Sequence, residues 1–365
     1  MKRVLIVMGT RPEAIKLCPL VKEMKQRSEF EVLVCATGQH RAMLDSAMEA
    51  FSVRADFDLD VMRTGQSSAT LASRVLKGID EVLEAEKPDL VLVQGDTTSA
   101  YVAALAAFYR RIPVGHVEAG LRTYRMDAPF PEELHRRSIA LLAKYHFAPT
   151  VTAKKNLLRE GFAEDTVFVT GNTVVDALRT TLTECQPAKP WELPADKRIL
   201  LFTAHRRENL GEKLMGMFRA LGRIVEAHED VIAICPVHHN PAVRAAADQL
   251  SGMERIRMIE PPEIVSFHHL LTRCHLILTD SGGIQEEAVA LGIPTVVMRY
   301  STERSEGMRA GVLKLAGSGE EGIVEVVSRL LSPNSPEYAS MKKPSSVYGD
   351  GKASMRIADF LSHVS

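Results

Sequence analysis

The sequence predicts an α/β protein of two Rossmann-like, doubly wound domains with a central cleft between them. Short β-branched runs alternate with longer amphipathic stretches along the chain, a pattern typical of parallel strands covered by helices on both faces. The alternation stops at a proline-rich stretch, Gln186 to Pro194, and then starts again. A length of 365 residues fits two such domains.

Each half of the chain has its own series of expected strands. The first series comprises Val4–Met8, Glu31–Ala36, Leu90–Gln94, Val114–Glu118, Tyr145–Ala148 and Val167–Thr170. The second comprises Ile199–Thr203, Val231–Cys235, Ile256–Ile259, Leu276–Thr279 and Thr295–Met298. Between them, apolar residues recur every three or four positions, for example in Glu13–Arg27, which indicates helices with one buried face.

The domain boundary is expected near the proline-rich stretch. Because proline cannot continue a helix, the linker should lie within Thr173–Pro194. We therefore expect an N-terminal domain at 1–173, a C-terminal domain at 174–352 and a last helix at about 353–365.

Composition limits the classes of protein that are compatible with this chain. Lys plus Arg number 45 and Asp plus Glu 46, a balance that argues against nucleic-acid and membrane-surface binding. The five cysteines form no CxxC pair, which favours free thiols in a reducing compartment. No apolar run reaches the roughly 20 residues of a membrane span, and the N-terminus does not suggest a signal peptide. We expect a cytoplasmic protein.

In doubly wound sheets, ligands bind beyond the carboxyl ends of the strands, so the residues that follow each strand are the first candidates for a site. After the first strand, Arg11 and Lys16 flank a helix start that would attract an anion such as a diphosphate. This turn matches neither G-x-G-x-x-G nor the P-loop spacing, which disfavours nicotinamide dehydrogenases and P-loop ATPases.

Three carboxylates also follow strands of the first half: Asp96, Glu118 and Glu132. Carboxylates that converge on one site are suited to removing and returning a proton bound to carbon. Each could instead be a surface charge, and Asp96 could simply cap the next helix.

In the second half, a strand ends in Asp280-Ser281-Gly282-Gly283, where the glycines would let a phosphate approach the start of a helix. Glu286 and Glu287 follow, and one of them could bind ribose hydroxyls or simply favour the helix dipole. His205 comes after the first strand of this half and, with its neighbouring arginines, could neutralise a leaving diphosphate.

Taken together, these residues resemble the bacterial non-hydrolysing UDP-N-acetylglucosamine 2-epimerases, whose fold is related to that of the GT-B glycosyltransferases. The resemblance covers nearly the whole chain, in the following runs: Gly9–Lys16, Gln94–Thr98, His116–Thr123, Pro131–Glu133, Thr170–Thr173, Ala204–Asn209, Asp280–Glu287, Thr302–Arg304 and Tyr348–Gly351.

The resemblance implies a homodimer whose last helix packs back on the first domain, and a reversible conversion of UDP-N-acetylglucosamine (UDP-GlcNAc) into UDP-N-acetylmannosamine (UDP-ManNAc). The reaction would proceed by elimination of UDP to a 2-acetamidoglucal, with no cofactor and no metal. It implies catalytic roles for Asp96, Glu118, Glu132 and His205. The residues implied for substrate binding are Arg11, Lys16, Phe267, Ser281, Gly282, Gly283, Glu287 and Arg304.

Many members of the family also bind a second UDP-GlcNAc as an activator. The residues that match positions used there are Gln39, Gln66, Arg206 and His238. The match is incomplete, because Ala42 stands where Gln is frequent and Gly65 where an Arg can occur. A further departure is His135, where the family usually has Asn; this change could alter substrate choice, activator contact or pH dependence, or be a neutral repacking.

Three other functions remain open from the sequence. A hydrolysing epimerase would release free N-acetylmannosamine, although the chain has no room for the fused kinase domain of the animal enzyme. A GT-B glycosyltransferase would need an acceptor pocket, and three clustered carboxylates suit proton transfer at carbon better. A nucleotide-sugar-binding regulator without activity would have no need of those carboxylates or of His205.

Overall fold

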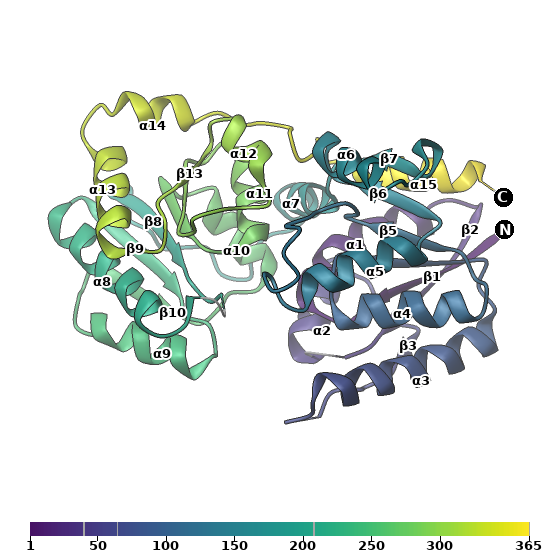
Figure 1. Ribbon diagram of the computed structural model, residues 1–365. Coiled ribbons are helices and arrows are strands. Elements are labelled where there is room, and N and C mark those ends of the chain that lie inside the picture. Colours follow the sequence, from purple (N-terminus) through teal and green to yellow (C-terminus); the bar gives the residue numbers. More distant parts are fainter. Residues whose placement is uncertain (39–40, 64, 207–208, 365) are drawn as a thin grey trace. The chain divides into compact units, whose positions relative to one another are not determined.

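The computed structural model describes residues 1–38, 41–63, 65–206 and 209–364, and it divides into two compact units (Figure 1). The first unit is Met1–Glu184 with Gly349–Ser365, and the second is Cys185–Tyr348. The boundary falls eleven residues after the expected one, because helix α7 (Thr173–Glu184) packs against α1 (Arg11–Lys25) and so joins the first unit.

The first unit is built on a seven-stranded sheet in the order β3-β2-β1-β4-β5-β6-β7. All neighbouring strands are parallel. The strands are β1 (Lys2–Met8), β2 (Phe30–Ala36), β3 (Phe57–Asp58), β4 (Leu90–Gln94), β5 (Val114–Val117), β6 (Tyr145–Ala148) and β7 (Val167–Val169). The central strands are buried, which explains their nearly continuous apolar sequences.

Helices cover this sheet on both faces. On one face α3 (Ser68–Glu86), α4 (Thr98–Tyr109) and α5 (Glu132–Leu142) lie side by side over a core of valine, leucine and alanine side chains. On the other, α1 contacts α2 (Arg41–Ala50), α7 and α15 (Ala353–His363). Two shorter elements, α6 (Val151–Arg159) and the 3-10 turn Glu164–Thr166, precede β7.

The last helix is fixed to the first unit by hydrogen bonds as well as by packing. The backbone N–H groups of Ala353 and Ser354 donate to the carboxylate of Asp176 in α7, at 3.1 and 2.7 Å. Arg356 donates to the carbonyl oxygen of Thr170 at 3.0 Å. The start of α15 therefore has its free N–H groups satisfied by an acid of a helix that is distant in sequence.

The second unit is built on a six-stranded parallel sheet in the order β10-β9-β8-β11-β12-β13. Its strands are β8 (Arg198–Thr203), β9 (Val231–Pro236), β10 (Ile256–Ile259), β11 (Leu276–Thr279), β12 (Thr295–Val297) and β13 (Leu313–Leu315). Helices α8 (Glu212–Ala227), α9 (Pro241–Ala247) and α13 (Glu320–Leu331) pack on one face. Helices α10 (Ile264–Leu271) and α11 (Gly282–Leu291) pack on the other. Short elements complete the unit: Asp248–Leu250, α12 (Ser305–Arg309) and α14 (Pro336–Met341).

The predicted fold class is confirmed: each unit is a doubly wound parallel sheet. The sequence missed β3 and β13. Both lie at a sheet edge and contain only two and three residues, so neither carries an apolar run long enough to stand out. Among the described helices, none is both long and apolar enough to cross a bilayer.

The strand order reverses once in each unit, and this is where ligands bind in such sheets. In the first unit the reversal lies between β1 and β4, which are followed by Gly9–Arg11 and Gly95–Thr97. In the second it lies between β8 and β11, which are followed by Ala204–Arg206 and Asp280–Gly282. Most of the residues that the sequence predicts for catalysis and substrate binding follow these strands or the strands next to them.

Candidate active site

Asp96 follows β4 and is partly exposed. Its Oδ2 accepts a hydrogen bond from Arg136 Nε at 2.7 Å, within an ion pair. His135 Nδ1 lies 2.8 Å from the Asp96 carbonyl oxygen, which can only accept, so Nδ1 carries the proton. The His135 ring stacks on Tyr101 of α4, with ring centroids 5.2 Å apart. His135 therefore packs against the Asp96 turn, and with Arg136 it fixes the acid from helix α5.

Glu118 follows β5, and its carboxylate is buried. Lys16 Nζ forms an ion pair with Oε2, and Asn172 Nδ2 donates to the same oxygen at 2.7 Å. The backbone of Glu118 has a φ of 65°, a conformation that is uncommon for residues other than glycine. Its Oε1 lies toward Gly95, 4.0 Å from a Cβ built on that glycine. Two donors thus hold one oxygen, and the other faces the turn that carries Asp96.

The position of Lys16 bears on its expected contact with a diphosphate. Its side chain is only 10% exposed, and its ammonium group already has Glu118 as a partner. A buried carboxylate needs such compensation, since an isolated charge is costly to remove from water. Lys16 therefore pairs with Glu118, and its contact with a diphosphate stays a prediction. Arg11, at the start of α1, is partly exposed.

The two acids at the start of α5 have different surroundings. Glu132 is partly exposed. Glu133 is fully buried and accepts from the backbone N–H groups of Thr123 and Tyr124, at 3.1 and 3.0 Å. It also contacts Arg136 at 3.4 Å. Glu133 is therefore held by the chain itself, which leaves Glu132 as the member of the pair that is accessible to a ligand.

Two buried histidines lie under this site. His116 in β5 has its Nε2 2.7 Å from the Gly95 carbonyl oxygen, and its Nδ1 has no hydrogen-bond partner within the described ranges. Burial lowers its pKa to about 3, and burial together with the nearby charge of Arg122 lowers the pKa of His146 to about 4. Both rings are neutral in the folded protein near neutral pH.

These pKa values predict a loss of stability in mild acid. Between pH 6.5 and about 3 His116 binds a proton in the unfolded chain but not in the folded one, so the free energy of unfolding falls as the pH falls through this range. Between pH 6.5 and 5 the wild type should lose about 2 kcal/mol more than His116→Gln. Chemical denaturation at the two pH values measures this difference. His363→Gln, at an exposed position of α15, is the matched control and should follow the wild type; equal losses for wild type and His116→Gln would contradict the prediction.

In the second unit, the fully buried carboxylate of Asp280 organises the turn that carries His205. Asp280 Oδ2 accepts from the backbone N–H groups of His205 and Arg206, at 3.1 and 2.9 Å, and from Asn209 Nδ2 at 2.9 Å. The ring of His205 is 38% exposed, and its Nδ1 lies 3.7 Å from Asp280 Oδ1. Asp280 thus links the turns after β8 and β11, a role that the sequence motif alone does not reveal.

The start of helix α11 combines open backbone with a buried cation. A Cβ built on Gly282 would come within 2.6 Å of the Arg304 guanidinium. On Gly283 it would meet no described atom within 4 Å. Arg304 is buried and paired with Glu286, at 2.9 Å, and with Glu303. Arg304 thus packs against the start of the helix, and its contact with a nucleotide remains a prediction.

Glu287 lies one turn further along α11 and is buried. Its Oε1 lies 3.2 Å from His268 Nε2 of α10, while Oε2 has no hydrogen-bond partner in the part of the chain that the structure describes. A buried acceptor without a partner is costly and is commonly completed by a ligand or by water. Phe267, next to His268, is partly buried and packs on the core under α10. The orphan oxygen makes Glu287 a candidate for binding a hydroxyl group.

The residues predicted for an activator site lie in both units. In the first, Gln66 contacts Met62 Sδ and Arg74, at 2.9 and 3.1 Å. In the second, His238 stacks on His205 with ring centroids 5.5 Å apart, and Arg206 lies 3.9 Å from Glu303. Gln39 lies outside the described residues, and so do Arg207 and Glu208 of the His205 motif. The activator site stays a prediction.

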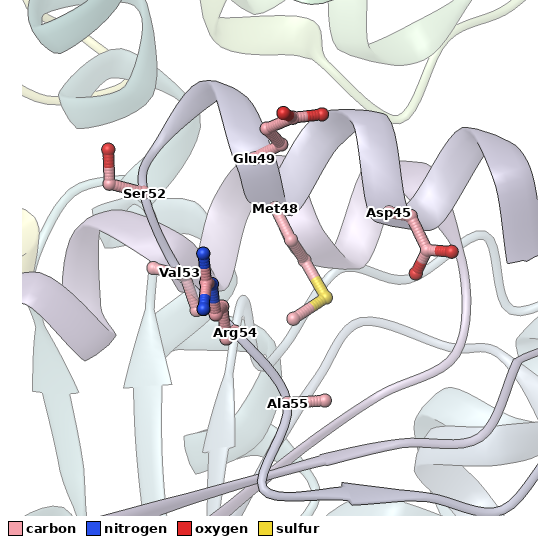
Figure 2. A pocket seen from close by; sticks show the side chains of 7 residues that line it. All are labelled: Asp45, Met48, Glu49, Ser52, Val53, Arg54 and Ala55. Carbon is pink, nitrogen blue, oxygen red and sulfur yellow. The ribbon is translucent and has the colours of Figure 1, made fainter.

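A surface pocket of about 500 Å³ lies along α2 and the segment after it (Figure 2). Its lining includes Asp45, Met48, Glu49 and Arg54. None of the residues predicted for catalysis or substrate binding belongs to it. This pocket is therefore separate from the strand ends that carry the candidate site.

Two doubly wound domains with acids after the strands of one and a glycine-rich helix start in the other define an enzyme of GT-B-like fold that acts on nucleotide sugars. The family model for UDP-N-acetylglucosamine 2-epimerase matches residues 22–362. This chain belongs to that family, as the sequence motifs predicted.

Individual relatives agree with the family assignment. The chain is 49% identical to UDP-N-acetylglucosamine 2-epimerase of Bacillus subtilis (strain 168), over 98% of this chain and 94% of that protein. The crystal structure of UDP-GlcNAc 2-epimerase from Neisseria meningitidis bound to UDP-GlcNAc has a TM-score of 0.95 and 42% identity, and the match covers 98% of this chain and 99% of that one. The Methanocaldococcus jannaschii enzyme in complex with UDP-GlcNAc and UDP has a TM-score of 0.86 and 33% identity, with 100% of both chains covered.

Proposed function

We propose that this protein interconverts UDP-GlcNAc and UDP-ManNAc by inverting the sugar at C2. The observation that carries the proposal is the carboxylate of Glu118, which is buried with one oxygen against Lys16 and Asn172 and with the other toward Gly95, the residue before Asp96. A carboxylate held beside a cation at the end of a strand is suited to accepting a proton from carbon. Asp96 and Glu132 complete the set from which the second proton-transfer group comes.

The proposed reaction proceeds by elimination and re-addition. A carboxylate takes the C2 proton as the C1–O bond breaks, and the bonding electrons leave with UDP, so that a 2-acetamidoglucal forms. A proton then returns to C2 from the opposite face, and a diphosphate oxygen of UDP bonds to C1 again. His205 would stabilise the departing diphosphate by donating a hydrogen bond or a positive charge. The steps need no cofactor and no metal.

For the nucleotide, the second unit offers two matching features. The backbone N–H groups at the start of α11, beside Gly283, suit the phosphates, and the orphan Glu287 oxygen suits a ribose hydroxyl. Ser281, Gly282 and the buried Arg304 would shape this phosphate site, and Phe267 would lie near the uracil. Arg11 of the first unit would supply a further cation for the diphosphate.

Three broader properties belong to the same proposal. We infer that the protein forms a homodimer and that a second UDP-GlcNAc can activate it, since members of the resembling family do so. All five cysteines lie in the described part of the chain and form no disulfide there, which fits a reducing compartment such as the cytoplasm. There the product would supply N-acetylmannosamine for cell-surface polysaccharide synthesis.

The decisive experiment is incubation of the purified protein with UDP-GlcNAc in D2O, followed by NMR at C2 of the sugar. We expect deuterium at C2 in both epimers, with the nucleotide still attached. Release of free N-acetylmannosamine would instead identify a hydrolysing epimerase, and transfer to an added acceptor without exchange would identify a glycosyltransferase. No exchange, even with added activator, would overturn the proposal.

A further inference from the structure

One buried acid of the first unit has no role in the proposed chemistry. Glu13 lies in the first turn of α1, and its side chain is 1% exposed. Its Oε2 accepts the backbone N–H of Gly9 at 3.1 Å, and its Oε1 accepts the hydroxyl of Thr97 at 2.8 Å. One carboxylate therefore joins the turn after β1 to the turn after β4, at the point where the strand order reverses.

Thr97 has two functions in this arrangement. It is the N-cap of α4, and its Oγ1 accepts the backbone N–H of Ala100 at 3.0 Å. The same hydroxyl donates its proton to Glu13. The link to Glu13 thus fixes the orientation in which α4 begins, directly after Asp96.

The packing around these turns leaves little room for adjustment. A Cβ built on Gly9 would come within 2.3 Å of Ser99 Oγ and 2.4 Å of Thr37 Oγ1. Those two hydroxyls hydrogen-bond to each other at 2.8 Å. The ends of β1 and β2 and the start of α4 therefore meet around one glycine. Glu13 accepts hydrogen bonds from Gly9, at the end of β1, and from Thr97, at the start of α4.

An acid in the first turn of a helix is usually explained by the helix dipole. That explanation does not require burial, because an exposed Glu interacts with the dipole without being removed from water. Burial of Glu13 is unfavourable for its charged form and raises its pKa to about 7. Glu13 interacts locally with the N-cap residue Thr10, and its contacts with Gly9 and Thr97 also join the ends of two strands. Those two contacts explain its burial better than the helix dipole does.

We propose that Glu13 is a positioning residue of the epimerase reaction, which acts with the Thr97 hydroxyl to hold the Arg11 turn and the Asp96 turn in their working arrangement. The inference rests on the proposed function. Glu13 itself touches no reacting atom; its effect reaches the substrate through Asp96, the residue before Thr97, and through Arg11, two residues before Glu13.

The test compares Thr97→Val, Thr97→Ser and Glu13→Gln, all assayed for C2 exchange and turnover in the full-length protein. Thr97→Val keeps the shape of the side chain but removes the hydroxyl, and it should lower kcat on the order of tenfold or more, with KM changed less than about threefold. Thr97→Ser keeps the hydroxyl and should recover activity to within about threefold of the wild type.

Glu13→Gln is a second, nearly isosteric substitution that tests the same link in case Thr97→Val folds poorly. An amide oxygen can still accept one of the two hydrogen bonds, and the amide NH2 cannot accept the other, so kcat should again fall about tenfold. Because both variants break one link, the Glu13→Gln, Thr97→Val double variant should be no worse than about threefold below either single variant, rather than a hundredfold below the wild type.

Thr150 provides the matched control. It too is a side-chain N-cap of the first unit, and its Oγ1 accepts the backbone N–H of Ala153 at 3.1 Å at the start of α6. Thr150 is buried, whereas Thr97 is partly buried. Thr150→Val should lower Tm about as much as Thr97→Val does and leave kcat unchanged, since α6 carries none of the proposed site. If the link between Glu13 and Thr97 had only a structural role, Thr97→Val and Thr150→Val would have the same kcat.

The outcomes separate this inference from the proposed function. If the wild type shows no C2 exchange, the proposed function fails. If the wild type is active while Thr97→Val and Glu13→Gln keep wild-type kcat, the positioning role is wrong and the function stands. A strictly additive double variant, or a failure of Thr97→Ser to recover activity, would also overturn the inference.

Discussion

Glu118→Gln should reduce C2 proton exchange by a factor of a thousand or so, while the affinity for UDP changes by less than about threefold. The amide has nearly the shape of the carboxylate but cannot accept a proton at the working pH. The Kd for UDP should change little because, apart from Arg11, the proposed nucleotide contacts lie in the second unit, whereas Glu118 follows β5 of the first. Deuterium incorporation by NMR measures the first quantity, and calorimetric titration with UDP the second.

The substitution also removes the charge partner of Lys16, so stability must be followed at the same time. Breaking a buried ion pair commonly costs on the order of 3 kcal/mol, and Tm should fall accordingly. The assay is therefore run well below Tm. Glu184→Gln, which removes an exposed ion pair with Lys22 in the same unit, is the control and should keep full exchange. Exchange within tenfold of the wild type in Glu118→Gln would remove this residue from the acid–base set.

How far the sequence predicts this molecule depends on whether a feature is local. Long buried strands such as β4 and β8 are predicted because parallel strands covered on both faces are apolar throughout. Asp96 and Glu118 are predicted as site residues because each lies at or just beyond the end of a predicted strand, and ligands bind beyond the carboxyl ends of such strands. Edge strand β13 is a Leu-Lys-Leu segment, which is too short for its apolar residues to predict a strand.

The contacts between side chains could not be predicted in the same way. Lys16 and Glu118 are 102 residues apart, and no pattern in the sequence pairs them rather than pairing Lys16 with a diphosphate. Glu13 meets Thr97 across 84 residues, and Asp280 meets the His205 turn across 75. Such pairs follow from strand order, which brings distant turns together, and a single sequence does not give that order.

Helix α11 begins with two adjacent glycines, and the structure explains the absence of a side chain at only one of them. At Gly282 the space for a Cβ is taken by the Arg304 guanidinium, 2.6 Å away, so alanine there would disturb the protein itself. At Gly283 the space is open within the described part of the chain, and a helix prefers alanine to glycine by up to about 1 kcal/mol. Folding thus explains the first glycine but not the second.

Gly283→Ala should therefore leave Tm unchanged or slightly higher and weaken UDP binding on the order of tenfold or more, because the methyl group occupies the space through which a phosphate reaches the backbone N–H groups. Thermal melts and calorimetric titration with UDP measure the two quantities on one preparation. Gly282→Ala is the comparison, since its clash with Arg304 should lower Tm and UDP affinity together. If Gly283→Ala binds UDP as the wild type does, phosphates do not approach this turn. The loss of affinity without loss of stability is what distinguishes a ligand-binding glycine from a structural one.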